Sequence, residues 1–175
     1  AVGALALDAV TTNSYNTAIG YQALTSNTAC CNTAVGRNAM AVNTTGESNT
    51  AVGLNALSSN TTADNNVAVG RNSLVNNTTG ERNIAIGNYA LDANTTANDN
   101  TAIGQDTLGA NTTGTQNTAV GAYSLDANTT ASNNTAMGYA ALTANTTGGS
   151  NTAVGRAALN SNTTASNNTA VGYEA

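Results

Sequence analysis

The chain has 175 residues, of which 7% are charged and 3% are aromatic, and every aromatic residue is Tyr. It contains no His, which excludes an imidazole base, a His-ligated metal site and a His-led catalytic triad. With four Arg against nine Asp and Glu, the net charge is −5, so no nucleic-acid partner is expected. No apolar run approaches the roughly 18 residues of a membrane span, so no membrane insertion is expected.

A single repeating unit fills the chain from end to end. Its most regular residue is a Gly that recurs every 17 residues, apart from one interval of 16. A fixed period of this kind is the signature of a solenoid or array, so residues 1–175 are predicted to form one continuous repeat domain. The repeat residues include Gly20, Gly36, Gly53, Gly70, Gly87, Gly104, Gly121, Gly138 and Gly155, and the Leu four positions later, as at Leu24, Leu57 and Leu91.

The first element of each unit is the segment Asn-Thr-Ala-Val-Gly, which is predicted to be a short strand. Its second and fourth positions are fully apolar at Val67 and Val69, so this face is expected to carry a Val ladder of the core. Its third and fifth positions are Ala and Gly. Two explanations of this small face stay open: Gly permits a positive φ at the strand end, or a second chain packs closely against the face, which predicts a trimer.

The second element is the Ala-Leu segment, predicted to be another short strand, with Asn, Gly, Ser and Asp forming the turns between strands. No helix is predicted, because the apolar residues do not recur at i, i+3, i+4 and i+7. The predicted fold class is therefore all-β: a parallel β-solenoid of about ten coils stacked at about 4.8 Å. Ladders of Val on Val, Leu on Leu and Asn on Asn are expected in its core, and its stability is expected to come from stacked neighbours.

The Asn-Thr-Thr segment, which occurs in eight repeats from Asn43 to Asn162, is an N-glycosylation sequon. One sequon per coil would place a column of covalent N-glycans along one edge, and no metal or other cofactor is expected. Alternatively, these Asn side chains form a ladder of amides hydrogen-bonded between coils. A second Asn column, which begins at Asn32, is mostly outside sequons and is expected to be structural. The candidate glycosylation sites are Asn43, Asn60, Asn77, Asn94, Asn111, Asn128, Asn145 and Asn162.

The block Asn-Thr-Ala-Val-Gly-x-x-Ala-Leu resembles the repeats in the heads of trimeric autotransporter adhesins and is similar to repeats of viral tail-fibre-like proteins. Residues 66–70 and 83–87 come closest to the adhesin motif. The resemblance implies a left-handed parallel β-roll that assembles as a homotrimer at an extracellular surface. The chain also begins and ends inside the repeat block, which favours a window on a longer fibre or end-to-end stacking into a filament.

Three further features carry candidate chemistry. Cys30 and Cys31 are adjacent in the shortened repeat, where they form interchain disulfides in an oxidising compartment or stay as two thiols of an irregular coil. Tyr residues follow the repeat Gly, as at Tyr139, and form either an outer stripe for a carbohydrate or partner, or rim packing. Asp92 and Asp126 share one phase but lie two coils apart, so they are expected to be too distant to work as a pair.

No nucleophile stands with a base, so the chain is predicted not to be an enzyme. The leading hypothesis is a structural protein that forms a rigid extracellular fibre, coated with N-glycans if the sequons are used. One alternative is an adhesin head or tail-fibre shaft that binds a carbohydrate or another host-surface partner. Another is an ice-binding β-solenoid that uses the Thr rank made by Thr44, Thr61, Thr78 and Thr95.

Overall fold

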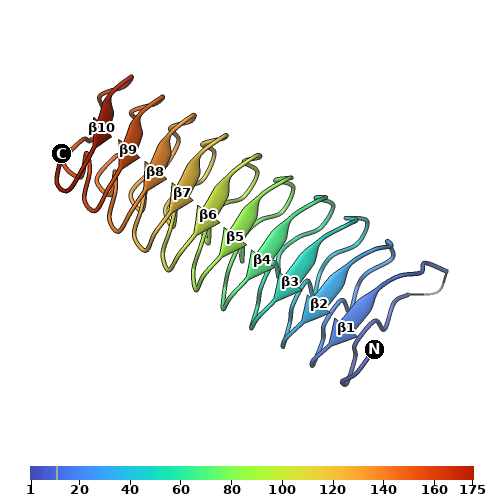
Figure 1. Ribbon diagram of the computed structural model, residues 1–175. Helices are drawn as coiled ribbons and strands as arrows, with labels where there is room; N and C mark the ends of the chain where they lie inside the picture. Colours follow the sequence, from blue (N-terminus) through green and yellow to red (C-terminus); the bar gives the residue numbers. More distant parts are fainter. Residues whose placement is uncertain (11) are drawn as a thin grey trace.

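The computed structural model describes residues 1–10 and 12–175 and confirms the predicted all-β parallel solenoid with a 17-residue period. Ten strands of three residues form one parallel sheet in which each strand pairs with the next along the chain (Figure 1). They are β1 (Thr17–Ile19), β2 (Thr33–Val35), β3 (Thr50–Val52), β4 (Val67–Val69), β5 (Ile84–Ile86), β6 (Thr101–Ile103), β7 (Thr118–Val120), β8 (Thr135–Met137), β9 (Thr152–Val154) and β10 (Thr169–Val171). Among the described residues, no helix is long and apolar enough to cross a bilayer.

The strands stack in unbroken register, so that each strand residue pairs with its equivalent one coil away. Ala51 of β3, for example, pairs with Ala68 of β4. The shortened repeat keeps this register too, because Ala18 of β1 pairs with Ala34 of β2. The missing residue falls in the turn between Asn27 and Asn32, away from the strands.

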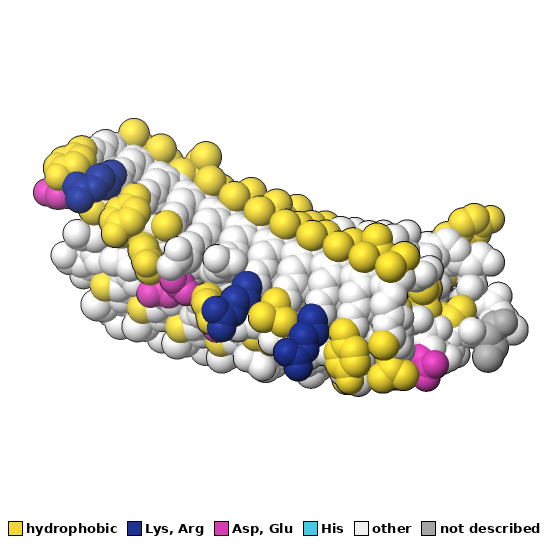
Figure 2. Space-filling model, turned by 90° about the horizontal axis from the view of Figure 1, so that it is seen from below, with side chains coloured by type: hydrophobic (Ala, Val, Ile, Leu, Met, Phe, Trp, Pro, Cys, Tyr) yellow, Lys and Arg dark blue, Asp and Glu magenta, His cyan; other side chains and the backbone are white. Residues whose placement is uncertain are grey.

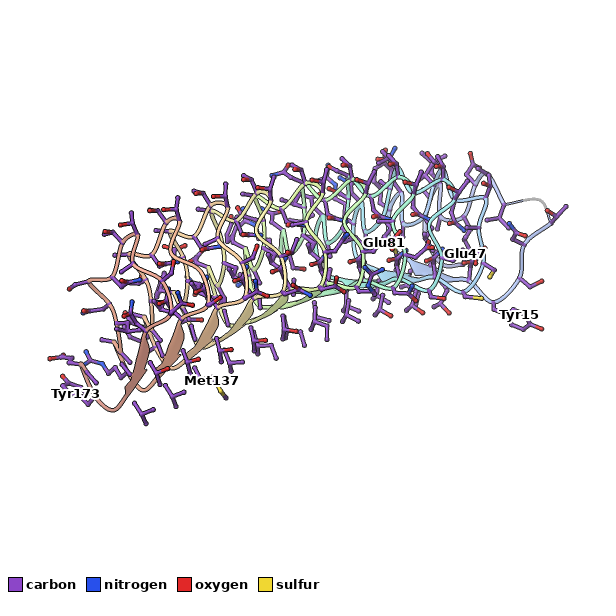
Figure 3. All side chains as sticks on the ribbon, turned by 90° about the horizontal axis from the view of Figure 1, so that it is seen from above. Tyr15, Glu47, Glu81, Met137 and Tyr173 are labelled. Carbon is purple, nitrogen blue, oxygen red and sulfur yellow. The ribbon has the colours of Figure 1, made fainter. Side chains whose placement is uncertain are left out.

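The sheet face that is buried is the opposite of the one that the sequence predicts. The central Ala of each strand is buried, as Ala102 is at 0% exposure, while the residues on either side of it point outward and are half-buried or exposed. Figure 3 shows this outward row beneath the sheet, including Met137. The interior is filled by Ala and Leu, which form one continuous buried cluster. The predicted Val ladder in the core is therefore wrong, because Leu from the opposite wall leaves room for only a methyl group under each strand.

The Ala-Leu segment lies in the interior as predicted, but it is a turn and not a second strand. Leu57, Leu74 and Leu91 are fully buried, and their φ angles of 53°, 49° and 52° lie in the left-handed region. Coil-to-coil hydrogen bonds continue through this turn, since the backbone N–H of Leu57 donates to the carbonyl of Ser73 at 3.0 Å. The left-handed backbone lets the chain turn a corner around a narrow interior while the Leu side chain points inward.

The repeat Gly satisfies two requirements at once. Gly70 has a φ of 129°, which disfavours any residue with a side chain. A Cβ on Gly70 would also lie 2.5 Å from the carbonyl oxygen of Gly87 in the next coil. The close approach therefore comes from the neighbouring coil of the same chain, and the prediction of a second chain packed on the Ala–Gly face is wrong.

Candidate functional site

A ladder of buried amides runs through the interior at the Asn-Thr-Thr segments. Each Asn Nδ2 donates to the Oδ1 of its equivalent in the preceding coil, as Asn94 does to Asn77 at 2.8 Å. The same Nδ2 donates to a carbonyl in its own coil, which for Asn94 is that of Ala97 at 3.1 Å. The fully buried members among the candidate glycosylation sites are Asn43, Asn60, Asn77, Asn94, Asn111, Asn128 and Asn145, while Asn162 in the last coil is half-buried.

This ladder leaves no room for sugar in the folded rod. Nδ2 is the atom that would carry an N-glycan, and at the seven buried positions it has no contact with solvent and makes two hydrogen bonds. Asn27 belongs to the same ladder, since it accepts from Asn43 Nδ2 at 2.7 Å, although Asn27-Thr28-Ala29 is not a sequon. The structure therefore favours the structural ladder over the glycan column.

The second Asn column forms another interior ladder, as expected. Its Oδ1 atoms accept from backbone N–H groups one coil on, so that Asn66 N donates to Asn49 Oδ1 at 2.9 Å. Asn66 Nδ2 donates to the carbonyl of Gly80 at 2.9 Å, and the first ladder reaches the same carbonyl through Asn77 Nδ2, also at 2.9 Å. The two ladders thus meet at one oxygen per coil, which ties the turn to both walls of the interior.

The Thr rank named in the ice-binding alternative is also tied to the backbone. Thr44 Oγ1 donates to the carbonyl of Thr61 at 2.9 Å, and Thr78 Oγ1 donates to that of Thr95 at 3.0 Å. Thr44 and Thr95 are exposed and Thr61 and Thr78 are half-buried, while the second Thr of each pair, such as Thr62 or Thr96, is exposed throughout. The hydroxyl groups of Thr44, Thr61 and Thr78 thus donate to the backbone of the next coil, and no observation favours ice as a ligand of this rank.

Arg and Tyr side chains gather along one edge of the rod, just after the repeat Gly, and Figure 2 shows the Arg side chains spaced along it. The Arg71 guanidinium lies 5.4 Å from the centre of the Tyr89 ring. The Arg156 guanidinium lies 5.9 Å from the Tyr139 ring and 5.1 Å from the Tyr173 ring. Tyr thus lies on this edge together with Arg, and a contact stripe for a carbohydrate or partner stays a prediction beside the alternative of rim packing. We call this row of residues the Arg–Tyr edge.

Asp92 and Asp126 come closer together than the sequence predicts. Gly109 stands between them in the intervening coil, and a Cβ placed there would lie 3.0 Å from Asp126 Oδ1 and 3.5 Å from Asp92 Oδ1. Burial raises the pKa of both carboxyls above their usual value, and the nearby Asp106 raises both further. In the part of the chain that the structure describes, no three His, Cys, Asp or Glu side chains gather as a metal site.

The two cysteines are free thiols in the turn of the shortened repeat. Cys30 is half-buried and Cys31 is exposed, with a φ of 67° at Cys31. A hydrogen bond with the Cys31 side chain, together with burial, raises the pKa of Cys30 to about 11. Cys31 is therefore the more accessible thiol, and the interchain disulfide stays a prediction that depends on it.

No family model, no curated protein and no solved structure matches the chain. The resemblance to adhesin heads and tail fibres accordingly stays a prediction.

Proposed function

We propose that the chain is a structural module, a rigid rod that forms an extracellular fibre by associating with further copies of itself. The observation that carries the proposal is the unbroken register of the ten strands, each of which pairs only with its sequence neighbours. A coil of 17 residues buries too few side chains to offset the conformational entropy lost when it orders. Each coil is therefore stable only against its neighbours, and a long array of them makes an extended element.

The outward face of the sheet is the surface that we assign to association. Its aliphatic row has no charged member, and it forms a continuous hydrophobic ridge along the rod (Figure 2). Met137 in this row is 46% exposed and Ile103 is 37% exposed. Contiguous exposed apolar surface of this kind is typical of interaction sites. The row consists of Ile19, Val35, Val52, Val69, Ile86, Ile103, Val120, Met137, Val154 and Val171.

Sedimentation velocity over a range of protein concentrations tests the proposal. We expect oligomers that grow with concentration, with the trimer implied by the resemblance as the first species. The variant Val120→Lys should weaken association without unfolding the chain, because Val120 points outward from β7. Thr113→Lys is the matched control, since Thr113 is exposed and lies outside the sheet. A monomer at every concentration would contradict the proposal.

A further inference from the structure

The first half of the Arg–Tyr edge alternates between apolar and cationic side chains, coil by coil. The order is Tyr21, Arg37, Leu54, Arg71 and, one position later in its coil, Tyr89. Tyr21 is 47% exposed and Leu54 is 38% exposed, and both Arg residues are exposed. Because coils stack at about 4.8 Å, the two guanidinium groups lie on coils about 10 Å apart.

Among the described residues, neither Arg37 nor Arg71 has a carboxylate partner. Within residues 1–10 and 12–175, the ion pairs of the protein belong to Arg82 and Arg156. The carboxylates lie at other positions of the repeat. Those that directly follow the repeat Leu are Asp8, Asp92 and Asp126, and those in the turn after the Asn-Thr-Thr segment are Glu47, Asp64, Glu81 and Asp99. The remaining two, Asp106 and Glu174, lie in the later coils of the edge. In a chain with a net charge of −5, the positions of the Arg–Tyr edge from Tyr21 to Tyr89 therefore carry two Arg and no acidic residue.

A shallow uncharged groove borders the same stretch. It has a volume of about 410 Å³, and it is lined by Gln22, Thr25, Ser26, Asn38, Ala41, Val42, Asn55 and Ser58. The groove adjoins the edge because Asn38 and Asn55 directly follow Arg37 and Leu54 in sequence. Six of its eight lining residues carry an amide or a hydroxyl that can pair with ligand hydroxyl groups, and carbon atoms line the rest of the groove.

The amides beside the groove are held in place, and one acceptor among them is unused. Asn38 Nδ2 donates to Asn55 Oδ1 at 3.2 Å, and Asn55 Nδ2 donates to Asn72 Oδ1 at 3.1 Å. Asn38 Oδ1, at the end of this row, is buried and has no hydrogen-bond partner among the described residues. The amide row is therefore ordered beside the groove, while Asn38 Oδ1 itself is closed to a ligand.

We propose that this face binds a linear acidic polysaccharide in which carboxylate-bearing and neutral sugars alternate. Arg37 and Arg71 would each hold a carboxylate in a charge-assisted, two-pronged hydrogen bond. Tyr21 and Leu54 would lie against the apolar faces of the sugars between them, and the groove would take up sugar hydroxyls. This site is separate from the outward sheet face, so the proposal goes beyond the fibre and does not depend on it.

Titration calorimetry with a hyaluronan octasaccharide at low ionic strength tests the assignment. We expect binding that weakens as salt is added, because exposed charge pairs are screened. Arg37→Gln and Arg71→Gln should each lower the affinity about tenfold, which corresponds to the loss of one charged hydrogen-bonding group. Arg82→Gln is the matched control and should leave affinity unchanged, since Arg82 lies in the acidic turn and is paired with Asp99 at 2.7 Å.

Three results would overturn the proposal. The first is no binding of the octasaccharide at low ionic strength, and the second is an affinity of the Arg37→Gln, Arg71→Gln double variant equal to that of the unsubstituted protein. The third is an affinity for a neutral chitin oligosaccharide of the same length equal to the affinity for the hyaluronan octasaccharide. Circular dichroism establishes that each variant is folded, which is expected because both Arg side chains are exposed. Failure here leaves the fibre proposal standing, since that proposal is judged by self-association and not by polysaccharide binding.

Discussion

Position 70 requires a glycine for two reasons, a positive φ and the absence of a Cβ beside the next coil, and one substitution tests both. Replacing Gly70 with Ala places a methyl group 2.5 Å from the Gly87 carbonyl oxygen on a backbone with a φ of 129°. We expect Gly70→Ala to lower the free energy of unfolding by about 3 kcal/mol or more, as strained and overpacked sites do. Urea denaturation measures the loss.

Gly109→Ala is the control for this comparison. Gly109 has no left-handed φ, and the nearest atom to its Cβ would be the end of the Asp126 side chain at 3.0 Å, which can move, while the Asp106 carbonyl oxygen and Asp92 Oδ1 would lie at 3.5 Å. Its expected cost is below about 1 kcal/mol, as for most substitutions away from special backbone sites. An equal cost for the two variants would contradict the role assigned to the repeat Gly.

The carboxylates around Gly109 predict a pH-dependent stability. Burial, with Asp106 and Asp126 adding to it, raises the pKa of Asp92 above its ordinary value of 3.8. The folded protein therefore binds this proton more tightly than the unfolded chain, so ionised Asp92 lowers stability above the folded pKa. Asp92→Asn should raise the urea midpoint at neutral pH, and the gain should vanish at pH values below 3.8, where Asp92 is protonated in both states. A gain that did not change with pH would refute the burial of this charge.

At the scale of the repeated elements, the Asn ladder is expected to contribute more than its exposed neighbours. Asn94→Ala removes the donor to Asn77 Oδ1 and to the Ala97 carbonyl, and it removes the acceptor of Asn111 Nδ2. The Ala97 carbonyl keeps Asn83 Nδ2 as a donor, whereas Asn77 Oδ1 is left buried without one. We expect a loss of about 2–4 kcal/mol in the free energy of unfolding, from the unpaired buried acceptor and the lost ladder hydrogen bonds. Thr96→Ala, on an exposed residue of the same turn, should cost less than about 0.5 kcal/mol. Similar costs for the two variants would mean that the ladder is not structural.

The inward and outward sides of each coil give a second comparison. Leu125→Ala should cost about 2–5 kcal/mol, because Leu125 is fully buried in the continuous core. Val120→Ala should cost less than about 1 kcal/mol in the monomer, because Val120 points outward from β7. Denaturant unfolding at low protein concentration measures both losses. A larger loss for Val120→Ala than for Leu125→Ala would support the Val core that the sequence predicts.

The sequence was sufficient to predict the period, the strand position and the Asn ladder that begins at Asn32, since each depends on spacing. For the Asn-Thr-Thr column it left a glycan column and an amide ladder both open, because the sequon does not say which way the side chain points. It was not sufficient to predict which strand face is buried, because hydropathy favours Val over Ala, whereas the interior width is fixed by Leu across the coil. The turn at Leu57 was missed for a related reason, as Leu rarely adopts a left-handed φ and only stacked neighbours enforce it here. The approach of Asp92 to Asp126 depends on a missing side chain at Gly109, which is visible only in three dimensions.

At the scale of the whole molecule, stability is expected to depend on coil register more than on chain length. Deleting residues 88–104 removes one 17-residue unit and restores every ladder across the junction. This variant should remain cooperatively folded, with a urea m-value lower by about a tenth, because the exposed surface on unfolding falls in proportion. Deleting residues 88–95 instead shifts the register of all later coils and should abolish the β circular dichroism signal. Equal tolerance of both deletions would contradict the stacked architecture.

The most direct test of the rod is the distance between outward residues that are a known number of coils apart. Spin labels at Val35 and Val120 are separated by five coils, and labels at Val35 and Val154 by seven. In a Cys30→Ser, Cys31→Ser background, double electron–electron resonance should give narrow distributions near 24 Å and 34 Å, from a coil rise of about 4.8 Å. Distances that fail to grow with coil number, or broad distributions in a folded protein, would contradict a rigid rod and with it the proposed fibre.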